Sequence, residues 1–211
     1  MRFDEHIGGG ETVIFREKFE DRMRRIRMAG RAVLGQALPD DAPWYVLCVQ
    51  TGREQETGEA VRDCGAEVLV PMRKGKQRKR RGRILPAVDE VLMVGYVLVR
   101  TAGTAEAMSG LMSFERVVGV LGGWERPFPV SAGRVQDLIG KASGGRYDWD
   151  RECSITVRAG ELVRISEGLF GGNDAVVITP NGQGKGDVVV EVEMFGQKTP
   201  VILPLAMLEK L

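Results

Sequence analysis

The sequence of 211 residues predicts an α+β fold followed by a small β-barrel. In residues 43–142, apolar strand-like runs alternate with amphipathic stretches in the order strand–helix–strand–strand–helix–strand, which favours helices packed on an antiparallel sheet. In residues 157–211, short β-branched runs are separated by glycine-rich turns, a pattern typical of a small barrel. Residues 143–156 combine glycine and charge without periodicity, which indicates a linker. Residues 1–42 form a separate N-terminal helical extension.

A helix is predicted in this extension, from Glu17 to Leu38. Apolar residues recur there at three- to four-residue spacing, beginning with Phe19, Met23 and Ile26, as on the buried face of an amphipathic helix. Glycines precede the helix and Pro39 follows it, and both residue types interrupt helices. The helix either binds a partner or is an amphipathic helix that packs on its own domain or is half-disordered, and we favour the second of these interpretations.

The remaining elements are assigned from apolar runs that end at glycine or proline and from amphipathic stretches that begin at capping residues. In the first domain, strands are predicted at Trp44–Val49, Glu67–Pro71, within Val88–Val99 and at Val117–Leu121, and helices at Arg53–Cys64, Thr104–Met112 and from Ser131 onwards. The barrel strands are predicted at Leu162–Ile165, Ala175–Ile178, Val188–Val192 and Thr199–Leu203. No run reaches the roughly 18 apolar residues of a membrane-spanning helix, so a membrane protein is excluded.

The positive charge is concentrated in one segment. The chain has 30 Lys+Arg against 29 Asp+Glu, a formal net charge of +1. Residues 73–83 contain eight basic residues and no acid, which leaves 22 basic against 29 acidic residues, a net charge of −7, in the rest. Such a segment can neutralise nucleic-acid phosphates without reading the base sequence. It contains no aromatic residue, so stacking on bases is not indicated. The alternative is a solvated surface loop.

Residues that would carry catalysis, a cofactor or a metal are not indicated. Cys48, Cys64 and Cys153 are odd in number and lack CxxC spacing, so neither a disulfide framework nor a zinc site is expected. His6 is the only histidine, and it lies near the terminus. The glycine-rich segment Gly182–Asp187 lacks the Ser or Thr that follows the lysine of a phosphate-binding loop. The start of the chain does not resemble a signal peptide, so we expect a cytoplasmic protein. Because no catalytic residues are indicated, we also expect that it is not an enzyme.

Several segments, in order, resemble the NusG family of transcription elongation factors. They are Trp44-Tyr45-Val46, Gly95–Val99, Arg116–Gly123 with Pro127–Val130, Gly160–Ile165 with Glu167–Phe170, and Met194–Val201. The resemblance implies an NGN-type antiparallel sheet with flanking helices, a linker and a KOW domain, which is an SH3-like small β-barrel. Met93-Val94 stand where the family usually has Phe-Pro, and Ala175 stands at the usual KOW glycine. Together with the extension, these departures resemble specialised paralogues such as RfaH.

The resemblance implies RNA polymerase as the main partner. In the family, an apolar face of the first domain binds the coiled coil of the polymerase clamp. The residues that match this face are Trp44, Tyr45, Met93, Val94 and Tyr96. Ser109, in the second helix, matches a region that touches a second polymerase element. For several of these side chains the alternative is a place in the core.

Two further kinds of partner are implied. The basic segment would lie at a hairpin tip and reach upstream or non-template DNA through Arg73, Lys74, Lys76, Arg78, Lys79, Arg80, Arg81 and Arg83. The KOW barrel would bind a ribosomal small-subunit protein or a termination helicase through Phe170 and Phe195, of which we expect Phe195 to be exposed. The implied function is a transcription elongation or antitermination factor. The alternative is a ribosome- or RNA-associated module, because KOW barrels also occur in ribosomal proteins.

Overall fold

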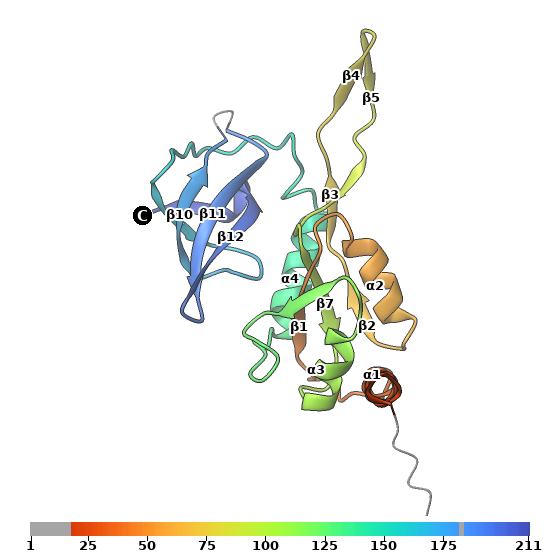
Figure 1. Ribbon diagram of the computed structural model, residues 1–211. Helices are drawn as coiled ribbons and strands as arrows, with labels where there is room; N and C mark the ends of the chain where they lie inside the picture. Colours follow the sequence, from red (N-terminus) through yellow and green to blue (C-terminus); the bar gives the residue numbers. More distant parts are fainter. Residues whose placement is uncertain (1–17, 182–183) are drawn as a thin grey trace, which may run out of the picture.

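The computed structural model describes residues 18–181 and 184–211 (Figure 1). Its first part contains a four-stranded antiparallel sheet in the order β2-β7-β1-β8. These strands are β1 (Trp44–Val49), β2 (Glu67–Leu69), β7 (Tyr96–Arg100) and β8 (Val117–Val120), and the helices are α1 (Phe19–Val33), α2 (Glu54–Arg62), α3 (Ala105–Met112) and α4 (Ala132–Ser143). The predicted α+β fold is confirmed.

The two faces of this sheet bury different neighbours. Leu47 of β1 packs with Met108 on the face covered by α1, α2 and α3. Trp44 and Val46 point to the other face, where Leu138 of α4 joins them. Successive residues of a strand alternate between faces, and β1 is apolar on both. This explains why β1 appears in the sequence as an uninterrupted apolar run.

Residues 162–210 form a second, five-stranded antiparallel sheet in the order β12-β11-β10-β9-β13. Its strands are β9 (Leu162–Ile165), β10 (Asp174–Thr179), β11 (Asp187–Met194), β12 (Gln197–Pro204) and β13 (Leu208–Lys210), and a 3-10 helix, η1 (Leu205–Met207), joins the last two. Buried and exposed residues alternate along β9, where Val163 and Ile165 point inward and Leu162 points outward. The structure therefore confirms the β-rich C-terminal region, which we call the barrel.

The helix α1 packs on α3 through two glycines. A Cβ atom on Gly30 would lie 2.9 Å from the Cα of Gly110, and one on Gly110 would overlap the Gly30 carbonyl group. The Arg31 guanidinium secures the same junction, because it donates to Ser113 Oγ (2.8 Å) and lies 4.1 Å from the centre of the Phe114 ring. The expected packing of the extension on the first domain is thus confirmed for the C-terminal half of α1.

Gly110→Val is expected to detach α1 from α3. The branched side chain would overlap the Gly30 backbone, which is held in place by the neighbouring Arg31 contacts. Overpacking of this kind lowers the free energy of unfolding by about 1–3 kcal/mol, and we expect fast amide hydrogen exchange across residues 19–33. Gly119→Val is the matched control, because a Cβ there has no neighbour within 4 Å. Equal exchange in the two variants would show that the glycine contact does not hold α1.

The cationic segment forms a β-ribbon that projects from the body of the molecule (Figure 1). At its base β3 (Met72–Lys74) pairs with β6 (Asp89–Val91), and at its tip β4 (Arg78–Arg80) pairs with β5 (Arg83–Leu85). Arg81 and Gly82 have φ values of 49° and 78° and make the turn between the tip strands. We call residues 72–91 the ribbon.

Residues 144–156, called the connector below, contain no helix or strand but are fastened at several points. The Trp149 N–H donates to the carbonyl oxygen of Lys74 (2.9 Å), and the Asp148 carboxylate accepts from the Lys74 N–H (3.0 Å). The Cys153 N–H donates to the carbonyl oxygen of Gly184 (2.8 Å). The segment expected to be a linker is therefore tied to both the ribbon base and the barrel.

Candidate functional site

The barrel packs against the face of the sheet that α1, α2 and α3 leave uncovered. One apolar cluster runs from Trp44, Met93 and Tyr96 of the first part to Leu169 and Phe170 of the barrel. The rings of Tyr96 and Phe170 meet edge to face, with 5.3 Å between their centroids and 69° between their planes. Such a pair stabilises a contact by roughly 0.5–1.5 kcal/mol beyond simple burial. We call this contact the seam.

Three of the predicted polymerase-binding residues lie together in the seam. Trp44, Met93 and Tyr96 are 5%, 1% and 8% exposed. Burial, with a smaller contribution from Cys48, raises the pKa of Tyr96 to about 12, so its phenol is neutral at physiological pH. These side chains therefore make a neutral apolar face, and in this structure the barrel covers it together with α4.

The other three predicted polymerase contacts lie elsewhere. Tyr45 belongs to the core on the opposite face, so its expected place beside Trp44 is wrong. The cause is the alternation of a strand, which separates neighbouring residues onto different faces. Val94 is half-buried in the turn before β7, and Ser109 is exposed on α3. The apolar pattern does not separate Tyr45 from Trp44, because both faces of β1 are covered.

The two phenylalanines of the barrel differ in exposure. Phe170 is fully buried in the seam, so this part of the expected accessory-factor surface is covered. Phe195 is 57% exposed, which confirms that it is the more exposed of the two. It stands in the β11–β12 turn with a φ of 54°, and its ring centroid lies 5.6 Å from that of Phe128. Only Phe195 is thus accessible to a partner in this arrangement.

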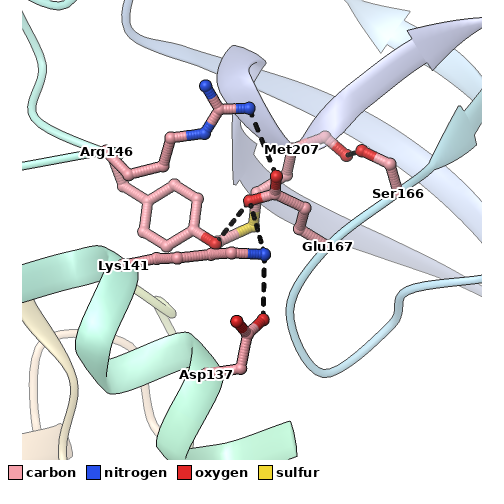
Figure 2. Close-up of polar contacts among 7 residues, drawn as sticks. Asp137, Lys141, Arg146, Ser166, Glu167 and Met207 are labelled. Atoms are coloured by element: carbon pink, nitrogen blue, oxygen red, sulfur yellow. Dashed lines mark hydrogen bonds and ion pairs between the residues drawn. The ribbon is translucent and has the colours of Figure 1, made fainter.

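Glu167 joins the barrel to α4 and the connector (Figure 2). Its carboxylate accepts from the Tyr147 hydroxyl (2.7 Å) and from Arg146 (3.2 Å), and the Lys141 Nζ lies 3.6 Å away. Asp137 on α4 shares Lys141 at 2.9 Å. Burial, followed by the hydrogen bond to Glu167, raises the pKa of the Tyr147 phenol well above its usual range. The proton therefore stays on Tyr147, which acts as a permanent donor across the seam.

A second polar contact links the ribbon base to the barrel. Arg73 donates to both carboxylate oxygens of Asp187, at 2.6 and 2.5 Å, and to the carbonyl oxygen of Tyr147 at 3.3 Å. Its guanidinium also lies 5.4 Å from the Trp149 ring. The side chain of Arg73 is 3% exposed, so its expected role in binding nucleic acid is wrong for this arrangement. Arg73 instead holds the barrel.

The other seven predicted nucleic-acid contacts are exposed on the ribbon: Lys74, Lys76, Arg78, Lys79, Arg80, Arg81 and Arg83. Lys74 pairs with Asp89 (2.7 Å), and the Lys76 ammonium lies 6.0 Å from the Trp149 ring centre. Among the described residues, no carboxylate pairs with the five cations of β4, the turn and β5. Arg80 faces Arg83 across the ribbon, an arrangement that repels. The tip therefore carries an uncompensated positive charge.

The residues that hold the seam are the main ones that the sequence does not reveal. Asp187 and Glu167 pair with residues that lie far from them along the chain, and no short motif marks either one. Within residues 18–181 and 184–211, no group of His, Cys, Asp and Glu side chains is placed to hold a metal ion. No helix in the same part of the chain is long and apolar enough to cross a membrane. His6 lies outside the described residues.

Comparison with known proteins gives matches over most of the chain. A family model, NusG, described as transcription termination factor nusG, matches residues 42–139. The transcription termination/antitermination protein NusG of Vibrio parahaemolyticus is 31% identical over 187 residues, which cover 80% of this chain and 95% of that protein. The NusG proteins of Haemophilus influenzae and Escherichia coli K12 are 32% and 29% identical over 184 residues, with 80% and 79% of this chain and 94% and 95% of theirs covered. A solved structure described as domain interaction in Thermotoga maritima NusG covers 80% of this chain and 96% of its own at 22% identity, with a TM-score of 0.42.

Proposed function

This chain belongs to the NusG family of transcription termination and antitermination factors, and we propose that it binds the clamp coiled coil of RNA polymerase. The contact would use the sheet face that carries Trp44, Met93 and Tyr96. In this proposal residues 43–142 are the NGN domain, 143–156 the linker and 157–211 the KOW domain. The chain acts in the cytoplasm as a binding protein and catalyses no reaction.

The observation that carries the proposal is that this apolar face is covered by α4 and by the barrel, and that of the two only the barrel belongs to a separate sheet. Aromatic and methionine side chains supply large contact area, so the face suits a protein partner. The barrel is a separate sheet joined through the connector, and its place can be taken by another apolar surface. Polymerase and barrel then compete for one face. The apparent dissociation constant for polymerase equals the intrinsic one divided by the fraction of molecules in which the barrel is undocked, so docking weakens polymerase binding.

The direct test adds the purified full chain to a stalled elongation complex and measures binding and pause lifetimes. A bound factor changes pausing only if it prefers one state of the clamp to the other. Failure to bind at micromolar concentration, both for the parent chain and for a variant with the barrel released, would overturn the proposal. Co-sedimentation with ribosomes that does not depend on residues 43–140 would support the ribosomal alternative instead.

The same proposal assigns the ribbon tip to the phosphate backbone of upstream or non-template DNA. Five cations without carboxylate partners stand on a two-stranded ribbon that reaches beyond the body of the molecule (Figure 1). Each phosphate that is neutralised releases counterions, so binding of this kind weakens steeply with salt. The contact would position the protein without reading base sequence.

The double variant Arg78→Glu/Arg81→Glu is expected to weaken binding of a 20-base-pair DNA duplex. Loss of two phosphate contacts lowers the slope of log K against log salt by about two, because each contact contributes roughly 0.9. Fluorescence anisotropy between 50 and 200 mM salt measures both quantities. Lys198→Glu, at an exposed barrel cation that pairs with Glu191, is the control and should leave the slope unchanged. If the control lowers the slope as much, the ribbon is not the contact.

In this proposal the barrel recruits a second factor, a ribosomal small-subunit protein or a termination helicase. Phe195 offers an exposed aromatic anchor in the docked arrangement. Phe170 becomes available only when the barrel leaves the sheet, because it is part of the seam. Release of the barrel would therefore expose the polymerase face and complete the recruitment surface in one step.

A further inference from the structure

The N-terminal half of α1 extends beyond the elements on which the helix packs. Gly30 is its one buried residue, and there the helix meets the backbone of Gly110 on α3. Phe19, Ile26 and Met28 are 77%, 43% and 65% exposed. Scattered single apolar side chains are normal on a surface, but several large ones on one short element mark an interaction site. Phe19 and Ile26 share one side of the helix and Met28 lies on the opposite side, and nothing in the described chain covers these side chains.

A groove of about 580 Å³ runs along the helix from Phe19 to Arg31 and ends at Ser113. Its apolar lining is Phe19, Met23 and Met28, and its charged lining is Glu20, Arg24, Arg27 and Arg31. Among the described residues, none of these three arginines forms an ion pair, and Arg31 is held by the neutral Ser113 and Phe114. The groove is thus apolar and carries a net positive charge.

We propose that this groove docks an acidic amphipathic helix of a protein partner. Its apolar side chains would pack on Phe19 and Met23 along one edge of the groove, and its carboxylates would meet Arg24 and Arg27 beside them. This is the mode in which an amphipathic helix lies in a groove with anchors at i, i+3, i+4 and i+7. Nucleic-acid phosphates would use the arginines but leave the apolar lining exposed to water, so a protein satisfies more of the groove than a phosphate backbone does.

The probe is a fluorescein-labelled 18-residue synthetic helix with Leu at i, i+3, i+4 and i+7 spacing, Glu at the flanking positions and Ala elsewhere. Titrated with the full chain in 0.1 M salt, it is expected to bind with a dissociation constant on the order of 10 μM, because interfaces of full size range from micromolar to picomolar and this one is smaller. Arg24→Glu/Arg27→Glu should weaken binding by about tenfold or more, because two attractive pairs become repulsive. Phe19→Ser should weaken it independently of salt, because it removes apolar contact.

Three controls separate the groove from general charge. Arg22→Glu reverses one charge on α1 outside the groove lining, and Arg81→Glu reverses one on the ribbon, each half the charge change of the groove variant; neither should alter peptide binding. A peptide of equal composition with the leucines scattered should bind much more weakly. The exposed positions of Arg24 and Arg27 leave the fold intact, which circular dichroism checks.

Several outcomes would overturn the proposal. One is no peptide binding, and another is equal weakening by Arg22→Glu and by the groove variant. Another is binding of a 20-base-pair duplex, or of anionic phosphatidylserine vesicles, that requires Arg24 and Arg27 while peptide binding does not. That result would assign the groove to nucleic acid or to a membrane. A dimer of the full chain in sedimentation that dissociates with the same variant would assign it to a second copy.

Discussion

Asp187→Ala is expected to release the barrel from the sheet. Arg73 would remain charged and buried, with only the Tyr147 carbonyl as a hydrogen-bond partner at 3.3 Å. Removal of one partner of a buried pair costs about 3–5 kcal/mol. The pair joins the ribbon base to the barrel, so most of this cost falls on the seam and little on either sheet. Small-angle scattering should show a larger radius of gyration, and a protease should cut the connector faster.

Two further variants make this result decisive. Asp174→Ala breaks an ion pair within the barrel whose partners are about half exposed, and such pairs contribute only about 0–1 kcal/mol; it should leave the molecule closed. Arg73→Leu/Asp187→Leu removes both charges of the buried pair and should largely restore closure, since no buried charge is left unpaired. If Asp187→Ala is as compact and as resistant to protease as the parent chain, the pair does not hold the seam.

The second large effect concerns polymerase binding once the barrel is released. In the Asp187→Ala chain we expect tighter binding to the elongation complex than in the parent, because the competing barrel is displaced. Adding Tyr96→Asp should then reduce affinity by about 30-fold or more, since a central aromatic contact is worth at least about 2 kcal/mol and a carboxylate cannot enter an apolar contact without cost. Equilibrium binding of labelled elongation complex measures both steps.

Val118→Asp is the matched control for this second prediction. Val118 lies on β8 of the same sheet, is 68% exposed and does not belong to the seam. The same substitution there should leave polymerase binding unchanged. If Tyr96→Asp and Val118→Asp behave alike in the released chain, the clamp contact lies outside the seam. Thermal melting of each variant shows whether the fold has been kept.

Elements of regular structure follow from the sequence wherever one residue pattern settles them. The β-branched, mostly apolar run of β9 and the three- to four-residue spacing of α1 are local signals. β9 lies where it is predicted, and α1 ends at Val33, five residues before the predicted end at Leu38. The run in β1 shows a buried strand, but an apolar residue at every position gives no indication of which face each side chain takes. Tyr45 is therefore misplaced by the sequence while Trp44 is not.

The seam depends on relations that a single sequence does not contain. The low net charge of the barrel gives no sign that Asp187 is buried against Arg73, because the two are 114 positions apart and their pairing depends on how the sheets meet. Arg73 also looks like any other cation of its run until β3 and β6 place it at the base of the ribbon. Met93 is fully buried, and its burial likewise belongs to the cluster in which the two sheets meet.

The contact between Gly30 of α1 and Gly110 of α3 fixes the position of the helix segment from Phe19 to Gly30. Because Gly30 touches the backbone of Gly110, the helix cannot slide or roll at that point. Phe19 lies 11 residues before Gly30, which at 1.5 Å per residue places it about 16 Å along the helix axis from the glycine contact. Each residue inserted between Phe19 and Gly30 would turn Phe19 by about 100° around the helix axis, whereas seven inserted residues would return it nearly to its original face. The distance of Phe19 from the glycine contact and the direction in which it points are thus both set by the number of helical residues between Phe19 and Gly30.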